Sequence, residues 1–159
     1  MRLSVLATLA AIASPCYAEQ ASLDFLQGDW LLLDPTGKQV GTSHVEVRLP
    51  GAMIYELRSD ANGKLPVWFA ASEAKGGWVQ FFPGPKGSLR EFDPVSKAGT
   101  WPVVLGNEVV LRDGRSVTFR LTLDHASDNA SHRVLEMSSD GRKTWSTVFD
   151  YRYVRPGSH

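Results

Sequence analysis

Apolar and polar residues alternate along most of this chain with a period of two. That spacing places successive side chains on opposite faces of a β-strand. The clearest run covers residues 115–124, where four apolar residues alternate with three polar ones: Val117, Phe119, Leu121 and Leu123 against Thr118, Arg120 and Thr122. The pattern predicts a half-buried strand with one face toward a core.

Two further runs repeat the alternation. Residues 144–154 predict a last strand whose aromatic side has five members: Trp145, Thr147, Phe149, Tyr151 and Tyr153. Residues 53–58 alternate Met53, Tyr55 and Leu57 with Ile54, Glu56 and Arg58. Every second position of each run is therefore expected to share a face.

Turn-forming residues separate these runs at short intervals, as in Pro50-Gly51, Asn62-Gly63 and Asp113-Gly114. The pattern predicts about ten strands and no helix longer than a turn. Consecutive short strands joined by tight turns favour an all-β, up-and-down antiparallel meander, and closing such a meander removes its exposed edges. We therefore expect an eight- to ten-stranded barrel formed by a single domain over residues 19–159.

The first eighteen residues predict a cleaved signal peptide. Arg2 precedes a short apolar run, and the small-residue pattern ending at Ala18 indicates cleavage before Glu19. Export to a Gram-negative periplasm, or secretion, is the expected localisation. The single cysteine, Cys16, lies within the leader, so the mature chain has no disulfide and no thiolate nucleophile. No later apolar run is long enough to span a membrane.

The charge balance argues against some classes of binding partner. The whole chain has 17 basic and 17 acidic residues, and loss of Arg2 leaves a nearly neutral mature protein. Nucleic acids and anionic membrane surfaces attract strongly basic proteins, so neither is an expected partner. A small-molecule ligand, a monomeric or weakly dimeric state and no cofactor are expected.

The motif Gly28-Asp29-Trp30 at the predicted first strand resembles the Gly-x-Trp signature of lipocalin/calycin barrels. The chain is most similar to small bacterial calycin-like proteins of the DUF1579 type, whose function is unknown. The resemblance implies that Trp30 plugs the closed end of the barrel. It also implies that an arginine near the end of the last strand, Arg152 or Arg155, packs across the indole. Gly28, Trp30, Arg152 and Arg155 are thus the predicted barrel floor.

The chain departs from relatives of that kind in two respects. It lacks the disulfides and clear C-terminal helix of true lipocalins, and it lacks the Arg-x-Tyr ending with which fatty-acid-binding proteins hold a carboxylate. The resemblance therefore supports the barrel and not a fatty-acid ligand.

Aromatic residues crowd the middle of the chain and are the leading functional signal. Trp68 and Phe69 must point to opposite sides of one strand, and so must Phe81 and Phe82. One side belongs to the core, and the other is either covered or an exposed binding surface. The candidate ligand-binding residues are the aromatic and charged side chains of this region: Tyr55, Arg58, Trp68, Trp78, Arg90 and Glu91.

Catalytic chemistry has weaker support. Glu91 and Asp93 share a strand face, as do Glu56 and Arg58. Paired carboxylates can act as acid and base when burial separates their pKa values, but salt links on a wet face explain the same residues and are preferred. We predict no catalytic residue.

Neither metal binding nor a propeller motif is favoured. The cluster Asp124, His125, Asp128 and His132 has no recognised ligand spacing, and His44 is expected to be exposed. Residues 138–145, SSDGRKTW, resemble the Asp box of sialidase-like propellers, except that Arg142 replaces its glycine. The motif occurs once, so it predicts a hairpin turn with Trp145 in the core.

Three functions remain open. The first is an exported barrel that binds a small, partly apolar molecule without catalysis. The second is a barrel enzyme of isomerase or lyase type that uses a buried carboxylate, and the third is an envelope protein with an exposed aromatic interaction face. An apolar cavity with one or two charges would favour the first, a buried carboxylate with a raised pKa the second, and a filled barrel the third.

Overall fold

The computed structural model describes residues 22–84 and 87–157. It has ten strands after one turn of 3-10 helix: η1 (Asp24–Leu26), β1 (Gly28–Leu33), β2 (Gln39–Leu49), β3 (Met53–Asp60), β4 (Gly63–Ser72), β5 (Gly77–Pro83), β6 (Leu89–Pro94), β7 (Val103–Val110), β8 (Ser116–Ser127), β9 (Ala130–Ser138) and β10 (Ser146–Val154). Each strand pairs antiparallel with its neighbours in sequence, and β1 pairs with β10. The predicted all-β meander that closes into a barrel is confirmed.

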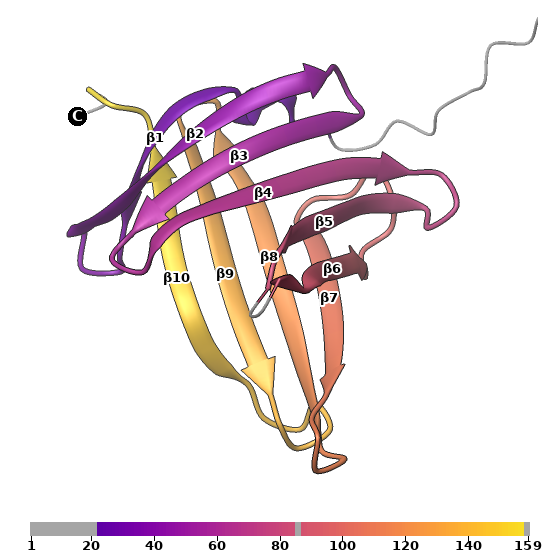
Figure 1. Ribbon diagram of the computed structural model, residues 1–159. Helices are drawn as coiled ribbons and strands as arrows, with labels where there is room; N and C mark the ends of the chain where they lie inside the picture. The colour runs from indigo at the N-terminus through magenta and orange to yellow at the C-terminus, as the bar shows by residue number, and fades with distance from the viewer. Residues whose placement is uncertain (1–21, 85–86, 158–159) are drawn as a thin grey trace, which may run out of the picture.

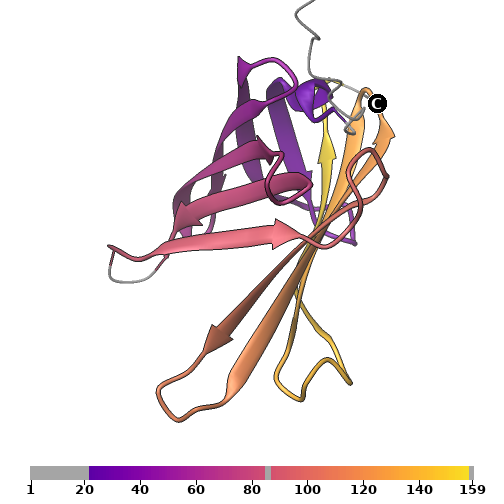
Figure 2. The ribbon, with the colours of Figure 1, turned by 90° about the vertical axis from the view of Figure 1, so that its right-hand side faces the viewer.

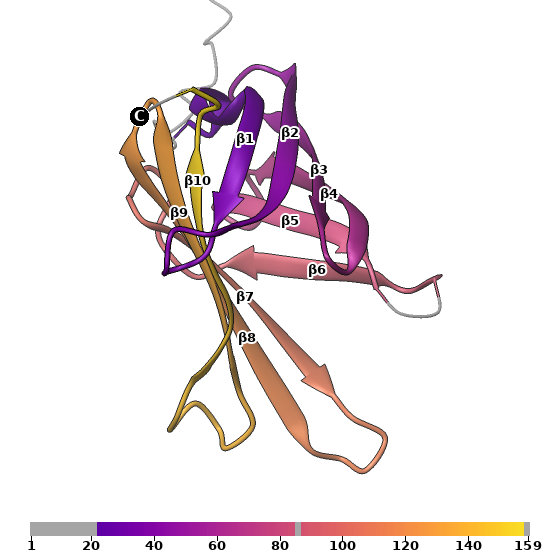
Figure 3. The same ribbon diagram turned by 90° about the vertical axis from the view of Figure 1, so that its left-hand side faces the viewer.

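The barrel has one short side and one long side. Figure 1 shows β7 to β10 continuing, with their hairpins, well past the level of β2 to β6. From the side, β6 and β7 diverge from a shared crossing point, so the open end of the barrel is a wedge between them (Figure 2). Figure 3 shows the same divergence from the opposite side, with β1 and β2 in front of β5 and β6. In the described parts of the chain, no helix has the length and apolar character needed to cross a membrane.

The pairing between β6 and β7 is short. Only two positions are in register, Asp93 with Gly106 and Pro94 with Leu105, whereas β7 and β8 pair at eight. Gly106 fits this crossing because a Cβ there would lie 2.8 Å from the Val95 side chain. Before Asp93, β6 diverges from β7 and creates the wedge, and the Asn107 side chain donates a hydrogen bond to the Glu91 carbonyl at 2.6 Å where the strands separate.

Strand alternation sorts the side chains into an interior and an outer face. On β3, Ile54 and Glu56 are buried, whereas Tyr55 and Leu57, which alternate with them, are partly exposed. The interior is filled mostly by apolar residues contributed by nearly every strand and by the N-terminal segment: Leu23, Leu26, Trp30, Leu32, Val45, Ile54, Val67, Phe69, Trp78, Phe92, Val103, Leu105, Leu121, Leu123 and Tyr153.

A β-bulge in β10 places residues that were predicted to share one face on opposite faces of the strand. The register jumps between Thr147, which pairs with Glu136, and Phe149, which pairs with Leu135. The extra residue changes the side to which the strand's residues point, because side chains alternate with a period of two. Phe149, Tyr151 and Tyr153 therefore face the interior, whereas Trp145 and Thr147 lie on the outer side. The prediction that all five share one face was wrong.

Candidate functional site

Trp30 closes one end of the barrel. The indole is buried, and its Nε1 donates a hydrogen bond to the Leu26 carbonyl at 2.6 Å. The guanidinium of Arg155 lies over the ring, 3.7 Å from the ring centre, and its Nη2 donates to the Phe25 carbonyl at 2.8 Å. The cation–π contact and the carbonyl bond together tie the end of the chain to the N-terminal turn.

The other predicted floor residues have different positions. Gly28 sits beneath the same arginine, because a Cβ at this position would lie 2.8 Å from Arg155 Nη1. Arg152 is exposed and lines an outer hollow with Asp150 and His132. Its assignment to the barrel floor was wrong, because Arg152 and Arg155 differ by an odd number of positions and only the second reaches the indole.

A polar cluster lies in the interior next to the floor. The Glu56 carboxylate, only 1 % exposed, accepts hydrogen bonds from Arg133 Nη1 at 2.5 Å and from Ser43 Oγ at 2.7 Å. The Tyr153 hydroxyl donates a third bond to it at 3.1 Å. The expectation that Glu56 and Arg58 lie on a wet face was wrong, because this face of β3 points into the barrel.

The cluster keeps Glu56 ionised. Burial raises the pKa of Glu56, but Arg133 and the Ser43 hydrogen bond more than offset this, so its pKa lies below the ordinary value. Burial also raises the pKa of Tyr153, which leaves the phenol protonated as a donor. A charged carboxylate whose neighbours all donate to it is a structural anchor, since it has no proton to give.

Beyond this cluster the interior contains an apolar cavity of about 80 Å³. Its walls come from seven strands: Arg58, Leu65, Val67, Gln80, Phe82, Phe92, Leu121, Leu135 and Phe149. A cavity of this size is larger than one water molecule needs, and its lining offers water few polar partners. The barrel is therefore not completely filled by its own side chains.

Arg58 is the charged residue of this cavity. Its guanidinium lies 4.9 Å from the centre of the Phe149 ring, and Nε lies 3.8 Å from Asp60 Oδ2. That separation is an ion pair without a hydrogen bond, and buried Nε has no hydrogen-bond partner in the described residues. Asp60 therefore compensates the charge of Arg58 without saturating its donors.

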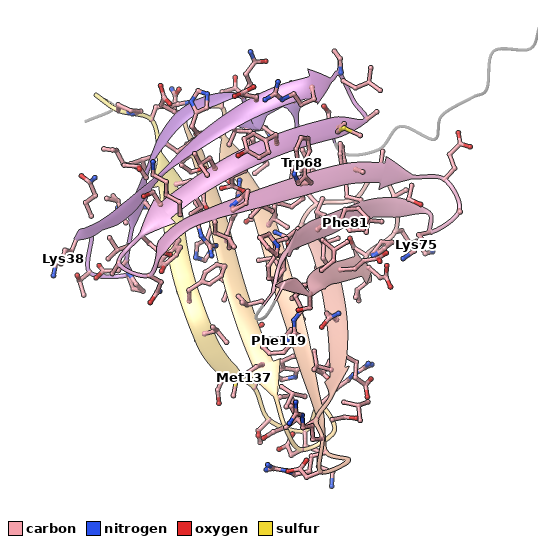
Figure 4. All side chains as sticks on the ribbon, viewed as in Figure 1. Lys38, Trp68, Lys75, Phe81, Phe119 and Met137 are labelled. Carbon is pink, nitrogen blue, oxygen red and sulfur yellow. The ribbon has the colours of Figure 1, made fainter. Side chains whose placement is uncertain are left out.

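A second cavity of about 250 Å³ occupies the wedge at the open end. One wall is the β5–β6 hairpin, with Phe82, Pro83, Gly84, Arg90 and Phe92, and the other wall comes from β7 to β9, with Asn107, Phe119 and Leu135. Phe82, Phe92 and Leu135 line both cavities, so the two cavities adjoin at these three side chains. Figure 4 labels Phe119 and Met137 on the long strands that form this far wall.

The structure divides the six predicted ligand residues by face. Arg58 and Arg90 line the cavities, and Trp78 is buried in the core. Glu91 points outward, where it pairs with Lys75 beside Asp93. The salt link preferred for Glu91 and Asp93 is thus present.

Tyr55 and Trp68 form an outer aromatic patch with Phe81. The three occupy paired positions on β3, β4 and β5, and the Tyr55 and Trp68 ring centres lie 4.7 Å apart. Trp68 is 40 % exposed, and Figure 4 shows it on the outer surface with Phe81 below it. These two predicted residues therefore do not reach the cavities.

The SSDGRKTW segment folds as a tightly bonded loop. Asp140 Oδ1 accepts from the backbone N–H groups of Lys143 and Thr144, each at 3.0 Å, and Oδ2 accepts from the Thr144 hydroxyl at 2.6 Å. These bonds hold the pKa of Asp140 far below its usual range, and the bond from the Thr144 side chain has the largest effect. Arg142 adopts a φ of 70°, a left-handed conformation, at the position where an Asp box has glycine.

Trp145 lies outside the barrel. The Arg120 guanidinium covers its ring at 4.2 Å, and both residues line an outer hollow of about 560 Å³ beside β7. The prediction of Trp145 in the core was wrong, because the bulge in β10 brings the indole to the outer side. Arg120 is held by Glu136 and Arg142 faces Glu108, so the hollow's charges are paired.

The histidine cluster does not converge. His132 pairs with Asp150 at 2.6 Å, whereas His125 stacks on Phe25 with 3.9 Å between ring centres. His44 is half exposed and pairs with Asp29. Across residues 22–84 and 87–157, no three histidine, cysteine or acidic side chains gather to hold a metal ion.

The most important interior residues that sequence reasoning missed are Arg133 and Ser43, which bind Glu56 from other strands. Arg133 lies two positions before Leu135 in β9, and this spacing places both side chains on the same, inward face. An arginine pointing inward requires a carboxylate nearby, and Glu56 shares its face with Ile54. The pairing itself depends on the barrel closing, which local alternation does not specify.

The comparisons with known proteins found no matching family model, no matching curated protein and no matching solved structure. The function must therefore be argued from the cavities themselves.

Proposed function

We propose that this protein is an exported, calycin-like barrel that binds a small, partly apolar molecule in its interior without transforming it. The observation that carries the proposal is the wedge cavity of about 250 Å³ that shares Phe82, Phe92 and Leu135 with the interior cavity. Ligand sites are concave, mostly apolar and marked by few polar groups, and these two cavities have that composition.

The enzyme hypothesis gains no support from Glu56. A general acid or base needs a pKa near the working pH and access to substrate. The pKa of Glu56 is lowered, its oxygens accept from three side chains, and it lines neither cavity.

The outer aromatic patch keeps protein interaction as the second candidate. Trp68 is 40 % exposed and packs against Tyr55. Exposed clusters of apolar side chains of this kind mark protein–protein interaction sites. Trp68→Ala provides the test. If ligand binding is unchanged and pull-down of an envelope partner is lost, the patch has this second role.

The binding proposal is tested with N-phenyl-1-naphthylamine, an uncharged dye that fluoresces in apolar sites. We expect saturable binding of about one dye per chain. Leu135→Trp, which fills the wall common to both cavities, should weaken binding at least about tenfold, while Leu111→Trp on an exposed position should not. Equal binding by both variants would show that the dye binds elsewhere.

A second measurement avoids any dependence on the fold of the variant. Native mass spectrometry of the unmodified protein purified from its own envelope should show an adduct that is lost on denaturation. N-terminal sequencing of the same sample tests export, since the predicted leader, residues 1–18, lies outside the described residues. A start at Glu19 supports cleavage, and an intact Met1 contradicts it.

A further inference from the structure

We propose that the ligand is an amphipathic organic acid that enters apolar end first and leaves its acidic group at the mouth of the wedge, on Arg90. The inference rests on the proposed function and adds the class of ligand and its orientation.

The first step is the balance of charge inside the barrel. Arg133 is paired with Glu56 and lines neither cavity. Arg58 lies beside Asp60 and over the Phe149 ring. Each interior cation thus has an acidic neighbour, and adding a ligand's carboxylate there would bury an extra negative charge.

The second step is the isolation of Arg90. It lines the wedge, yet no carboxylate in the described parts of the chain forms an ion pair with it. The nearest acids along β6, Glu91 and Asp93, lie on the opposite face and are held by Lys75. Arg90 is therefore an unpaired cation at the rim of an apolar cavity.

The third step is the room made for the Arg90 side chain. A Cβ on Gly84 would lie 2.9 Å from Arg90 Cγ and 3.0 Å from its Nε, closer than real contacts allow without movement. Gly84 N donates to the Ser88 carbonyl at 2.6 Å, which fixes the backbone at this point. The missing side chain at residue 84 lets Arg90 lie across the hairpin toward the wedge.

The fourth step is the apolar path beyond the rim. Phe82 is the cross-strand partner of Arg90, and it lines the wedge together with Phe92, Phe119 and Leu135. Phe82, Phe92 and Leu135 also line the adjoining interior cavity. An acid at the rim keeps contact with water and gains a charge-assisted, two-point partner in the guanidinium, while a hydrocarbon body is buried on these walls.

The test compares three ligands that share an alkyl chain, namely octanoate, 1-octanol and octylamine, as competitors of N-phenyl-1-naphthylamine at pH 7.5. We expect octanoate to bind at least about tenfold more tightly than octanol, and octylamine to bind most weakly. Arg90→Gln should remove the preference for octanoate while leaving octanol affinity unchanged. Gly84→Ala should reduce the preference, because it displaces Arg90 without removing it.

Two arginine variants serve as controls. Arg58→Gln removes the interior cation, and Arg152→Gln removes an exposed cation outside the cavities; both should keep the preference. Loss of the preference in Arg58→Gln but not in Arg90→Gln would overturn the orientation and place the acid inside. Equal binding of octanoate and octanol to the unmodified protein would overturn the inference that the ligand is an acid, while the proposed function would stand. Failure of the dye and all three competitors to bind would overturn the proposed function itself.

Discussion

The carboxylate of Glu56 and the guanidinium of Arg133 meet in the barrel interior at 2.5 Å, although 77 positions separate them in the chain. β3 and β9 lie in different parts of the strand order, and the pair joins them across the barrel. Neither charge has another ion-pair partner in the described residues, so each depends on the other.

Removing one member of this pair should destabilise the protein strongly. Glu56→Gln leaves Arg133 buried without a counter-charge, and we expect it to lower the free energy of unfolding by about 3–5 kcal/mol. Glu56→Leu combined with Arg133→Met should recover much of this loss, since no uncompensated charge remains. Urea melts of the single and double variants provide the measurement, with Glu108→Gln, on an exposed pair, as a control expected to cost under about 1 kcal/mol. A small effect of Glu56→Gln would mean that water reaches the cluster.

The same residue predicts a pH dependence. The folded-state pKa of Glu56 lies below its ordinary value of 4.5, so its ionised form contributes stability above that value. This contribution is lost as pH falls through the folded-state pKa. We expect the free energy of unfolding to fall on acidification below about pH 4.5 and the slope to be shallower in Glu56→Gln. Parallel pH profiles for the two proteins would contradict the prediction.

Trp30→Ala should cost roughly 3–5 kcal/mol, as expected for truncation of a buried aromatic residue. Arg155→Met removes the stacked cation and the bond to Phe25 but keeps apolar bulk, so its cost should be smaller, about 1–2 kcal/mol. Denaturant melts compare the two. An effect of Trp30→Ala well below 3 kcal/mol would mean that the indole does not seal the barrel.

Arg142→Gly should stabilise the β9–β10 loop. The left-handed conformation at φ 70° costs an L-residue about 1–2 kcal/mol, and glycine avoids this cost. Glycine also has more conformational entropy in the unfolded chain, which offsets part of this gain. We therefore expect the free energy of unfolding to rise by about 0.5–1 kcal/mol in thermal or urea melts. The neighbouring Lys143→Gly should destabilise the protein slightly. Loss of stability in Arg142→Gly would show that the arginine side chain contributes more than its backbone costs.

Local alternation was sufficient to predict the architecture. The predicted faces of β8 are confirmed, because Leu121 and Leu123 face the core while Arg120 and Thr122 do not. The predicted turns at Pro50-Gly51 and Asn62-Gly63 are also present, and both glycines have positive φ. Period-two patterning and turn chemistry are local properties, so one sequence carries them without knowledge of the partner strands.

The site was less predictable because it depends on non-local geometry. Alternation could not show whether Glu56 or Tyr55 faces inward, since both faces of β3 carry apolar residues. The bulge between Thr147 and Phe149 leaves no clear mark in the sequence, yet it decides the position of Trp145. Arg90 and Arg58 were named as candidates, but their different charge surroundings depend on strands far away in the chain.

The two paired positions between β6 and β7 have a consequence for the circumference of the barrel. A ring of strands held by many bonds at every junction has a fixed perimeter, and enlarging it requires strain throughout. At this junction Asp93 and Pro94 lie opposite Gly106 and Leu105, and proline contributes no N–H to the ladder. The N–H groups of Val95 and Ser96 donate to the Val104 carbonyl, and Asn107 Nδ2 donates to the Glu91 carbonyl. We therefore expect any change in the bore of the barrel to begin at this junction, which has the fewest in-register positions of the ten.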